Sequence, residues 1–226
     1  RLRNLLSSMV IEMATEESFK TVLRYISHRW FSGVGTIAVT ALFVLPYPPI
    51  VLSAEPEIGS ITAVRGMVIL KRPGAEDSVN LKEGLAFTVG DVVETGVSST
   101  AQMTLTDESF MNLGPGAAVR VSQFSYDPLT DRRTTMIRLI EGKTRFVIYK
   151  MRSPGSSFRV ETGNALVTTG GLADFIVTAS TVRTEVVVLE QGLVVRNSLP
   201  YIVGDVRVGV NQRTLIQEKS APTAPV

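Results

Sequence analysis

Short runs of apolar and β-branched residues recur through residues 59–217, and turn-type residues separate them about every 8–12 positions. Ala101–Thr106 alternates small or apolar with polar side chains, at the two-residue period of a half-buried strand. Met67–Leu70 forms another such run and leads into the turn Arg72-Pro73-Gly74. No window after residue 55 shows a sustained helical period. The pattern predicts an all-β fold, and we expect a two-sheet β-sandwich of jelly-roll type.

Two turns that contain glycine are predicted to close β-hairpins. Glu141-Gly142-Lys143 and Glu190-Gln191-Gly192 each separate two apolar runs, 137–140 from 145–149 and 185–189 from 193–195.

An uncharged segment, residues 30–54, follows the basic Arg24, His28 and Arg29 and ends in Ser53-Ala54. This arrangement is typical of a secretory signal peptide. The helical part before the first proline, residues 31–45, would extend ~22 Å, against a hydrocarbon core of ~30 Å. We therefore predict a signal peptide or membrane-anchor helix over residues 1–54 and favour cleavage after Ala54. An uncleaved anchor is the alternative, and it would be the chain's only membrane contact.

The rest of the chain is then a β-domain over residues 55–217 and a flexible tail over 218–226, which contains two prolines.

Composition narrows the function further. The chain has 226 residues, is 44% hydrophobic and carries a net charge of +2. Residues 1–54 hold 5 of the 23 basic and 3 of the 21 acidic residues, which leaves 18 of each after them. The neutral β-domain lacks the basic footprint of a nucleic-acid-binding protein, so we predict no nucleic-acid partner.

Histidine and cysteine chemistry is absent from the predicted β-domain. The chain has no cysteine, and its single histidine, His28, precedes residue 54. This excludes Ser-His-Asp and Cys-His catalysis and His-based zinc sites there. We therefore predict no enzymatic activity, no catalytic residue, no cofactor and no metal site.

The polar segment 125–133 is the preferred candidate for partner binding, because long loops on a β scaffold often carry recognition. Tyr126, Asp127, Arg132 and Arg133 are its candidate binding residues, and Tyr and Arg are enriched at protein interfaces. A plain exposed connection is the competing interpretation. The basic, turn-rich segment 150–157 is the second candidate.

Two acidic turns have local explanations. Asp91 is expected to cap its own turn by accepting backbone N–H bonds. Asp107, Glu108 and Asn112 supply oxygen ligands of the kind that Ca²⁺ prefers, but their spacing fits no established calcium loop. We therefore favour a solvated turn as the interpretation of Asp107, Glu108 and Asn112.

An ordered set of turn motifs resembles the FecR domain, a family named for the iron-dicitrate signalling protein of Gram-negative bacteria. The motifs are VGDVVETG at 89–96, TDESFMNLGPGAAVRV at 106–121, EGKTRF at 141–146, FRVETGNALV at 158–167, LEQGLVVRN at 189–197 and VRVGVNQRTLI at 206–216. The family's usual Arg-Gly-Thr is replaced here by Gly170-Gly171-Leu172, so any role of that turn is in doubt.

The resemblance implies a non-enzymatic signalling or binding module that acts in the periplasm or at the cell envelope through a protein partner. Regulators of the iron-dicitrate sensor type join such a domain to a membrane helix and a cytoplasmic anti-sigma domain. At most 29 residues precede the uncharged segment here, so the stand-alone exported type is expected and a membrane-anchored regulator is the alternative. A module that binds carbohydrate or envelope polysaccharide is a further alternative, since jelly rolls often bind sugars.

Overall fold

The computed structural model describes residues 56–149, 151 and 153–226, so the predicted signal or anchor segment over 1–54 lies outside the described residues. The described part contains 16 strands and no helix. This confirms the all-β prediction.

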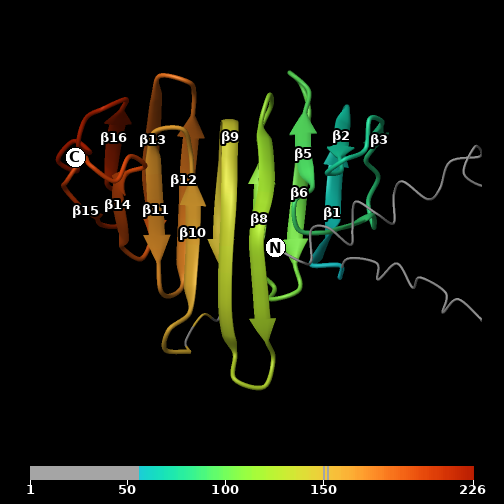
Figure 1. Ribbon diagram of the computed structural model, residues 1–226, viewed down its shortest axis with the longest axis horizontal. Coiled ribbons are helices and arrows are strands. Elements are labelled where there is room, and N and C mark those ends of the chain that lie inside the picture. Colours follow the sequence, from blue (N-terminus) through green and yellow to red (C-terminus); the bar gives the residue numbers. More distant parts are fainter. Residues whose placement is uncertain (1–55, 150, 152) are drawn as a thin grey trace, which may run out of the picture. The chain divides into compact units, whose positions relative to one another are not determined.

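The strands form one hydrogen-bonded network, which divides into two sets that share only β9 (Arg132–Ile148). Set A contains, in spatial order, β4 (Ala86–Phe87), β1 (Gly59–Arg65), β6 (Thr100–Leu105), β7 (Phe110–Leu113), the second half of β9, β12 (Ala173–Ala179), β13 (Arg183–Glu190) and β16 (Arg213–Gln217). Set B contains β3 (Ser78–Asn80), β2 (Val68–Lys71), β5 (Val92–Thr95), β8 (Ala118–Asp127), the first half of β9, β10 (Ser157–Glu161), β11 (Ala165–Thr169), β14 (Leu193–Asn197) and β15 (Val206–Val208). Figure 1 shows β9 in the middle of the array, between the earlier strands and the later ones.

Buried side chains of both sets belong to one hydrophobic cluster. In β6 every second residue is buried, as its alternating sequence predicts. Phe146 of set A stacks on Phe175 at 5.3 Å between ring centroids and meets Phe158 of set B edge-on at 6.1 Å. Each such ring, fully buried, stabilises the fold by about 1.5–3 kcal/mol.

One pairing departs from a jelly roll. Jelly rolls are antiparallel, whereas β10 pairs with β9 in parallel, from Ser157 opposite Thr134 to Glu161 opposite Arg138. The jelly-roll sandwich is therefore not confirmed.

The hairpin predicted at Glu141-Gly142-Lys143 is wrong, because β9 runs through this segment as a single strand of 17 residues. Glu141 still pairs with Ala118 of β8, whereas Gly142 already pairs with Ala179 of β12. Gly142 has a φ of 88°. This positive φ allows the strand to bend where it passes from set B to set A. The chain does not reverse its direction there.

The hairpin predicted at Glu190-Gln191-Gly192 is also wrong. A tight turn is present, with Gln191 at a φ of 59°. The strands on either side do not pair, because β13 pairs with β12 and β16 whereas β14 pairs with β11 and β15. This turn carries the chain from set A to set B.

The predicted tail over 218–226 is hydrogen-bonded to β16. Arg213 and Val226 exchange two backbone hydrogen bonds of 2.9 and 3.1 Å, and the Thr223 N–H donates to the Leu215 carbonyl at 2.9 Å. The Thr214 hydroxyl also donates to the Thr223 carbonyl at 2.7 Å. Because β16 has β13 as its only strand partner, the tail covers an edge that would otherwise expose unpaired backbone groups.

Candidate functional site

The four residues predicted for partner binding lie at the end of the β8–β9 hairpin. Tyr126 pairs with Arg133 and Asp127 pairs with Arg132, so only residues 128–131 form the turn. The prediction of a long loop over 125–133 is therefore wrong. The ends of β8 and β9 resemble a loop in sequence because their polar side chains lack a strict apolar alternation.

Asp127 closes this turn. Its carboxylate accepts hydrogen bonds from the Thr130 hydroxyl at 2.6 Å and from the Leu129 N–H at 3.0 Å. These bonds stabilise the charged form and lower the pKa of Asp127 below its ordinary value of 3.8. Asp127 is thus explained by the turn that it forms.

Arg133 is buried, with only 2% of its surface exposed. Its Nη1 donates to the Asp107 carbonyl at 3.1 Å, to Asp107 Oδ2 at 3.3 Å and to the Tyr149 carbonyl at 3.0 Å, while Nη2 donates to Asp131. The guanidinium also lies 5.0 Å from the centre of the Tyr126 ring. Arg133 therefore joins the hairpin to the β6–β7 turn and presents no free charge to a partner, whereas binding by Tyr126, Asp127 and Arg132 stays a prediction.

The other acidic candidates are also engaged locally. Asp91 accepts the Thr88 N–H at 2.9 Å, which confirms the predicted turn cap. Asp107 accepts the Ser109 N–H at 2.9 Å and is only 3% exposed, so its carboxylate is buried, whereas the neighbouring Glu108 of the same turn is exposed. Asn112 lies on β7 and does not join Asp107, and the described residues contain no cluster of three metal-ligating side chains.

The segment 150–157 lies partly outside the described residues, because neither Lys150 nor Arg152 is described. Its last residues are ordinary parts of the fold: the Ser156 hydroxyl accepts the Arg133 N–H at 3.2 Å and Ser157 begins β10.

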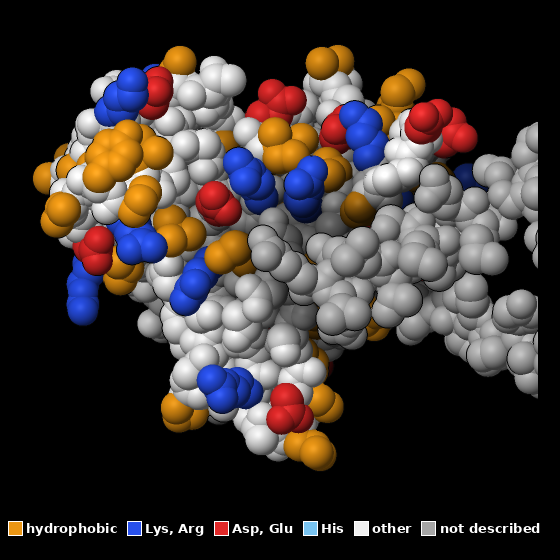
Figure 2. Space-filling model, in the orientation of Figure 1, with side chains coloured by type: hydrophobic (Ala, Val, Ile, Leu, Met, Phe, Trp, Pro, Cys, Tyr) orange, Lys and Arg blue, Asp and Glu red, His pale blue; other side chains and the backbone are white. Residues whose placement is uncertain are grey.

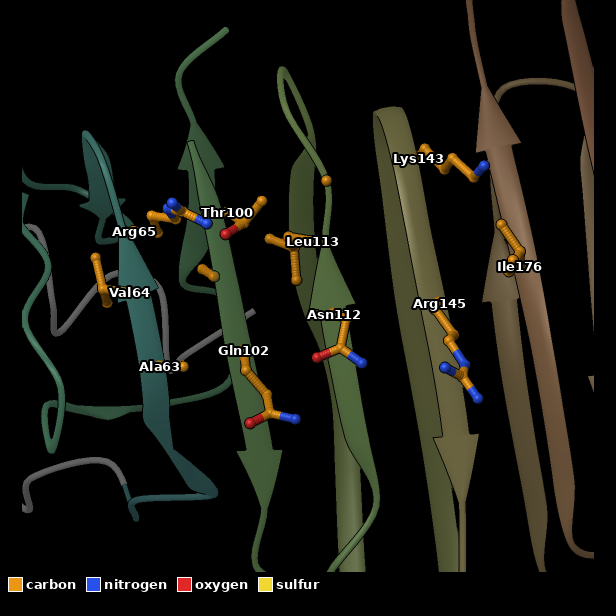
Figure 3. A pocket seen from close by; sticks show the side chains of 12 residues that line it. Ala63, Val64, Arg65, Thr100, Gln102, Asn112, Leu113, Lys143, Arg145 and Ile176 are labelled. Atoms are coloured by element: carbon orange, nitrogen blue, oxygen red, sulfur yellow. The ribbon is translucent and has the colours of Figure 1, made fainter. Parts of the chain in front are cut away.

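A groove of about 550 Å³ crosses the outward side of set A (Figure 3). It is open to solvent and draws its lining from five neighbouring strands and the turn after β7. The lining residues are Ala63, Val64, Arg65, Thr100, Ala101, Gln102, Asn112, Leu113, Gly114, Lys143, Arg145 and Ile176. We call this hollow the groove.

Two carboxamides occupy the middle of the groove. Strand register places Gln102 of β6 directly opposite Asn112 of β7, and Asn112 opposite Arg145 of β9. The Gln102 oxygen accepts the Thr62 hydroxyl at 3.0 Å, which turns its NH₂ group away from Thr62. Among the described residues, no side-chain hydrogen bond of Asn112 is found, although it is half-buried. The groove thus offers amide donors and an amide acceptor to a ligand.

Basic side chains stand around these amides. Arg65 and Lys143 lie near one end of the groove in Figure 3, and Arg145 lies beside Asn112. Arg145 Nε donates to Asp174 at 2.8 Å and its Nη2 completes a two-pronged ion pair. The hydrogen bonds to Asp174 raise the pKa of Arg145 above its ordinary value. Asp174 therefore holds Arg145 in place, while Arg65 and Lys143 have no acidic partner within the described part of the chain and leave positive charge at the groove.

The family model of the FecR protein matches residues 91–194, from the turn before β5 into β14. This part, a little under half of the chain, is similar to the FecR family. This confirms the resemblance inferred from the turn motifs, although the matched range is shorter than the resemblance. The FecR family is regulatory and non-enzymatic.

None of the curated proteins matches the chain. A candidate anti-sigma factor from Parabacteroides distasonis, crystallised and solved at 2.50 Å and at 1.65 Å resolution, is 22% identical to it with a TM-score of 0.48. The alignment covers 60% of this chain and 58% of the solved one, which is less than two thirds of that protein.

The groove of this FecR-like domain was not found from the sequence. Gln102, Asn112 and Arg145 all fall within the matched range, but 43 residues of sequence separate the first from the last. The sequence showed their polar, alternating positions in β6 and β7, but it did not show which strands are neighbours in the sheet.

Among the described residues, no helix is long and apolar enough to cross a membrane.

Proposed function

We propose that this FecR-like domain is an exported, non-enzymatic signalling module that binds a protein of the periplasm or cell envelope through the groove. The observation that carries the proposal is the pair of half-buried carboxamides, Gln102 and Asn112, which line the groove between basic side chains on the outward side of set A.

The chemistry of the groove favours a polypeptide ligand. Carboxamides donate to carbonyl oxygens and accept from N–H groups, which is the hydrogen-bonding repertoire of a peptide backbone. Arg65 and Lys143 would favour acidic side chains in the bound segment. The lining has no aromatic residue on which a sugar ring could stack, so the groove gives no support to the carbohydrate alternative.

The test compares two double variants of the full chain. In Gln102→Glu with Asn112→Asp, each NH₂ donor becomes a carboxylate oxygen of similar size. Recovery of the partner from envelope extracts after chemical cross-linking should fall about tenfold or more, because each lost donor costs about 1–3 kcal/mol.

The control, Gln123→Glu with Asn80→Asp, makes the same chemical change on exposed positions of β8 and β3 in set B. It should recover the partner as the native chain does. Equal recovery by the groove variant and the native chain, or recovery of no partner at all, would contradict the proposal.

Export is the second part of the proposal, and it rests on the uncharged segment 30–54 and on the FecR match. Expressed in a Gram-negative host, the full chain should yield a soluble periplasmic species whose intact mass begins at Glu55. An intact, membrane-bound species would instead support the anchored regulator, and a species confined to the cytoplasm would contradict export in either form.

A further inference from the structure

Five strands of set B each carry an arginine on their outward side. Each of these arginines is exposed, and four of them lie between two buried residues of the same strand. The fifth, Arg207, lies between the half-buried Val206 and the buried Val208. We call this surface the arginine face, and it consists of Arg120 on β8, Arg138 on β9, Arg159 on β10, Arg196 on β14 and Arg207 on β15. In Figure 2 basic side chains recur across the view, over β8, β9 and the strands beyond them.

These arginines are poorly compensated by acidic residues. Within the part of the chain that the structure describes, only Arg138 of the five has an acidic partner, Glu161, at 3.9 Å. That pair is solvent-exposed, with half of the Arg138 side chain accessible, so it neutralises little charge. The β-domain as a whole has equal numbers of acidic and basic residues, so the five arginines give this face a local positive charge that acidic residues elsewhere balance.

Two of the arginines oppose each other directly. Arg120 and Arg138 are cross-strand partners in the β8–β9 pair. Like charges in directly opposed positions destabilise a sheet. An anion bound between the two guanidinium groups would relieve their repulsion.

The curvature of the face distinguishes between flat and flexible anionic partners. From β8 through β9, β10, β11 and β14 to β15 there are five steps between neighbouring strands. At about 4.8 Å per step the arginine face extends roughly 24 Å. At the average rotation of about 20–25° between neighbouring strands, five steps correspond to a difference in orientation of roughly 100° between the two ends of such a face. A planar membrane surface would touch only part of such a face, whereas a flexible chain can follow it.

We propose that the arginine face binds a flexible anionic polymer, and specifically an acidic polysaccharide whose carboxylate or sulfate groups pair with the guanidinium groups. The surface is separate from the groove, which occupies the outward side of set A. The proposal therefore does not depend on the protein partner, and each can fail without the other.

The experiment measures binding of the full chain to alginate, a polymer of acidic sugars, with neutral dextran as the reference. Alginate should bind at low salt and be released as salt rises, because salt screens exposed charges. The triple variant Arg159→Gln, Arg196→Gln and Arg207→Gln should bind about tenfold more weakly, since three exposed ion pairs each contribute up to a few-fold in affinity.

A matched triple variant controls for net charge. Arg72→Gln, Lys82→Gln and Arg183→Gln remove the same charge from exposed positions outside the arginine face, and this variant should bind alginate within about twofold of the native chain. Equal weakening in both triple variants, or no alginate binding by the native chain, would overturn the proposal. So would binding to phosphatidylglycerol vesicles in place of alginate. Thermal melting of each variant verifies that it is folded.

Discussion

The Arg133→Ala variant is expected to unfold at a much lower urea concentration than the native chain, because it should lose about 3–5 kcal/mol of stability. The native guanidinium is 2% exposed and compensates the buried carboxylate of Asp107. It also satisfies the carbonyls of Asp107 and Tyr149. Alanine would leave a buried negative charge and unpaired oxygens next to a cavity.

Arg132→Ala is the matched control for this prediction. Arg132 is the neighbouring residue on β9 and is exposed, so its removal should change the free energy of unfolding by less than about 0.5 kcal/mol. Urea denaturation of the three chains, followed by circular dichroism, measures the difference. Similar midpoints for Arg133→Ala and Arg132→Ala would show that the buried cluster does not stabilise the hairpin.

The Gly142→Ala variant is expected to lose about 2–5 kcal/mol, although it adds a single methyl group. A φ of 88° is unfavourable for any residue with a Cβ atom, by about 1–2 kcal/mol. A Cβ atom at this position would also lie 2.4 Å from the Ala117 Cα and 2.7 Å from the Gly116 carbonyl oxygen. Both neighbours are backbone atoms, so the turn that leads into β8 would have to shift from β9 at the point where the strand changes sets, at a further cost of about 1–3 kcal/mol.

Gly163→Ala provides the comparison. A Cβ atom at Gly163 would meet nothing within 4 Å, and Gly163 does not require the left-handed backbone conformation. Its substitution should leave stability unchanged or raise it slightly, by reducing the entropy of the unfolded chain. Equal unfolding midpoints for the two variants would mean that Gly142 is not needed for the passage of β9 between the sets.

The continuity of β9 matters for function because this strand contributes to both proposed surfaces. Arg138, in its first half, belongs to the arginine face, whereas Lys143 and Arg145, in its second half, line the groove. Gly142 lies between the two halves. A polymer and a protein partner bound at the two proposed surfaces would therefore contact the same strand on the outward sides of different sets.

Local sequence was sufficient for the features that depend on neighbours in the chain. The alternation in residues 101–106 predicted β6 and its buried positions, because side chains on a strand point to opposite sides in turn. Arg72-Pro73-Gly74 predicted the turn after β2, and the position of Asp91 predicted a cap on its own turn. The order of such turns also identified the FecR family before any strand had been placed.

Only the tertiary structure decided which strands pair. A glycine at positive φ can reverse a chain or bend a strand, and the sequence around Gly142 is compatible with both. The outcome depended on β8 and β12, which lie on either side of β9 and pair with its successive halves. The turn at Gln191 likewise joins strands whose partners, β12, β16, β11 and β15, are distant in the sequence.

The candidate sites depended on the same long-range pairing. Exposed arginines were visible at scattered positions, but their common face followed from the order β8, β9, β10, β11, β14 and β15. The sequence predicts an interface role for Arg133 because nothing around it shows that Asp107 and Tyr149 will enclose it. Strand periodicity, local turns and the family resemblance could be predicted from the sequence, since neighbouring residues set them. Strand partners, the burial of Arg133 and the two surfaces were decided by contacts between segments far apart in the chain.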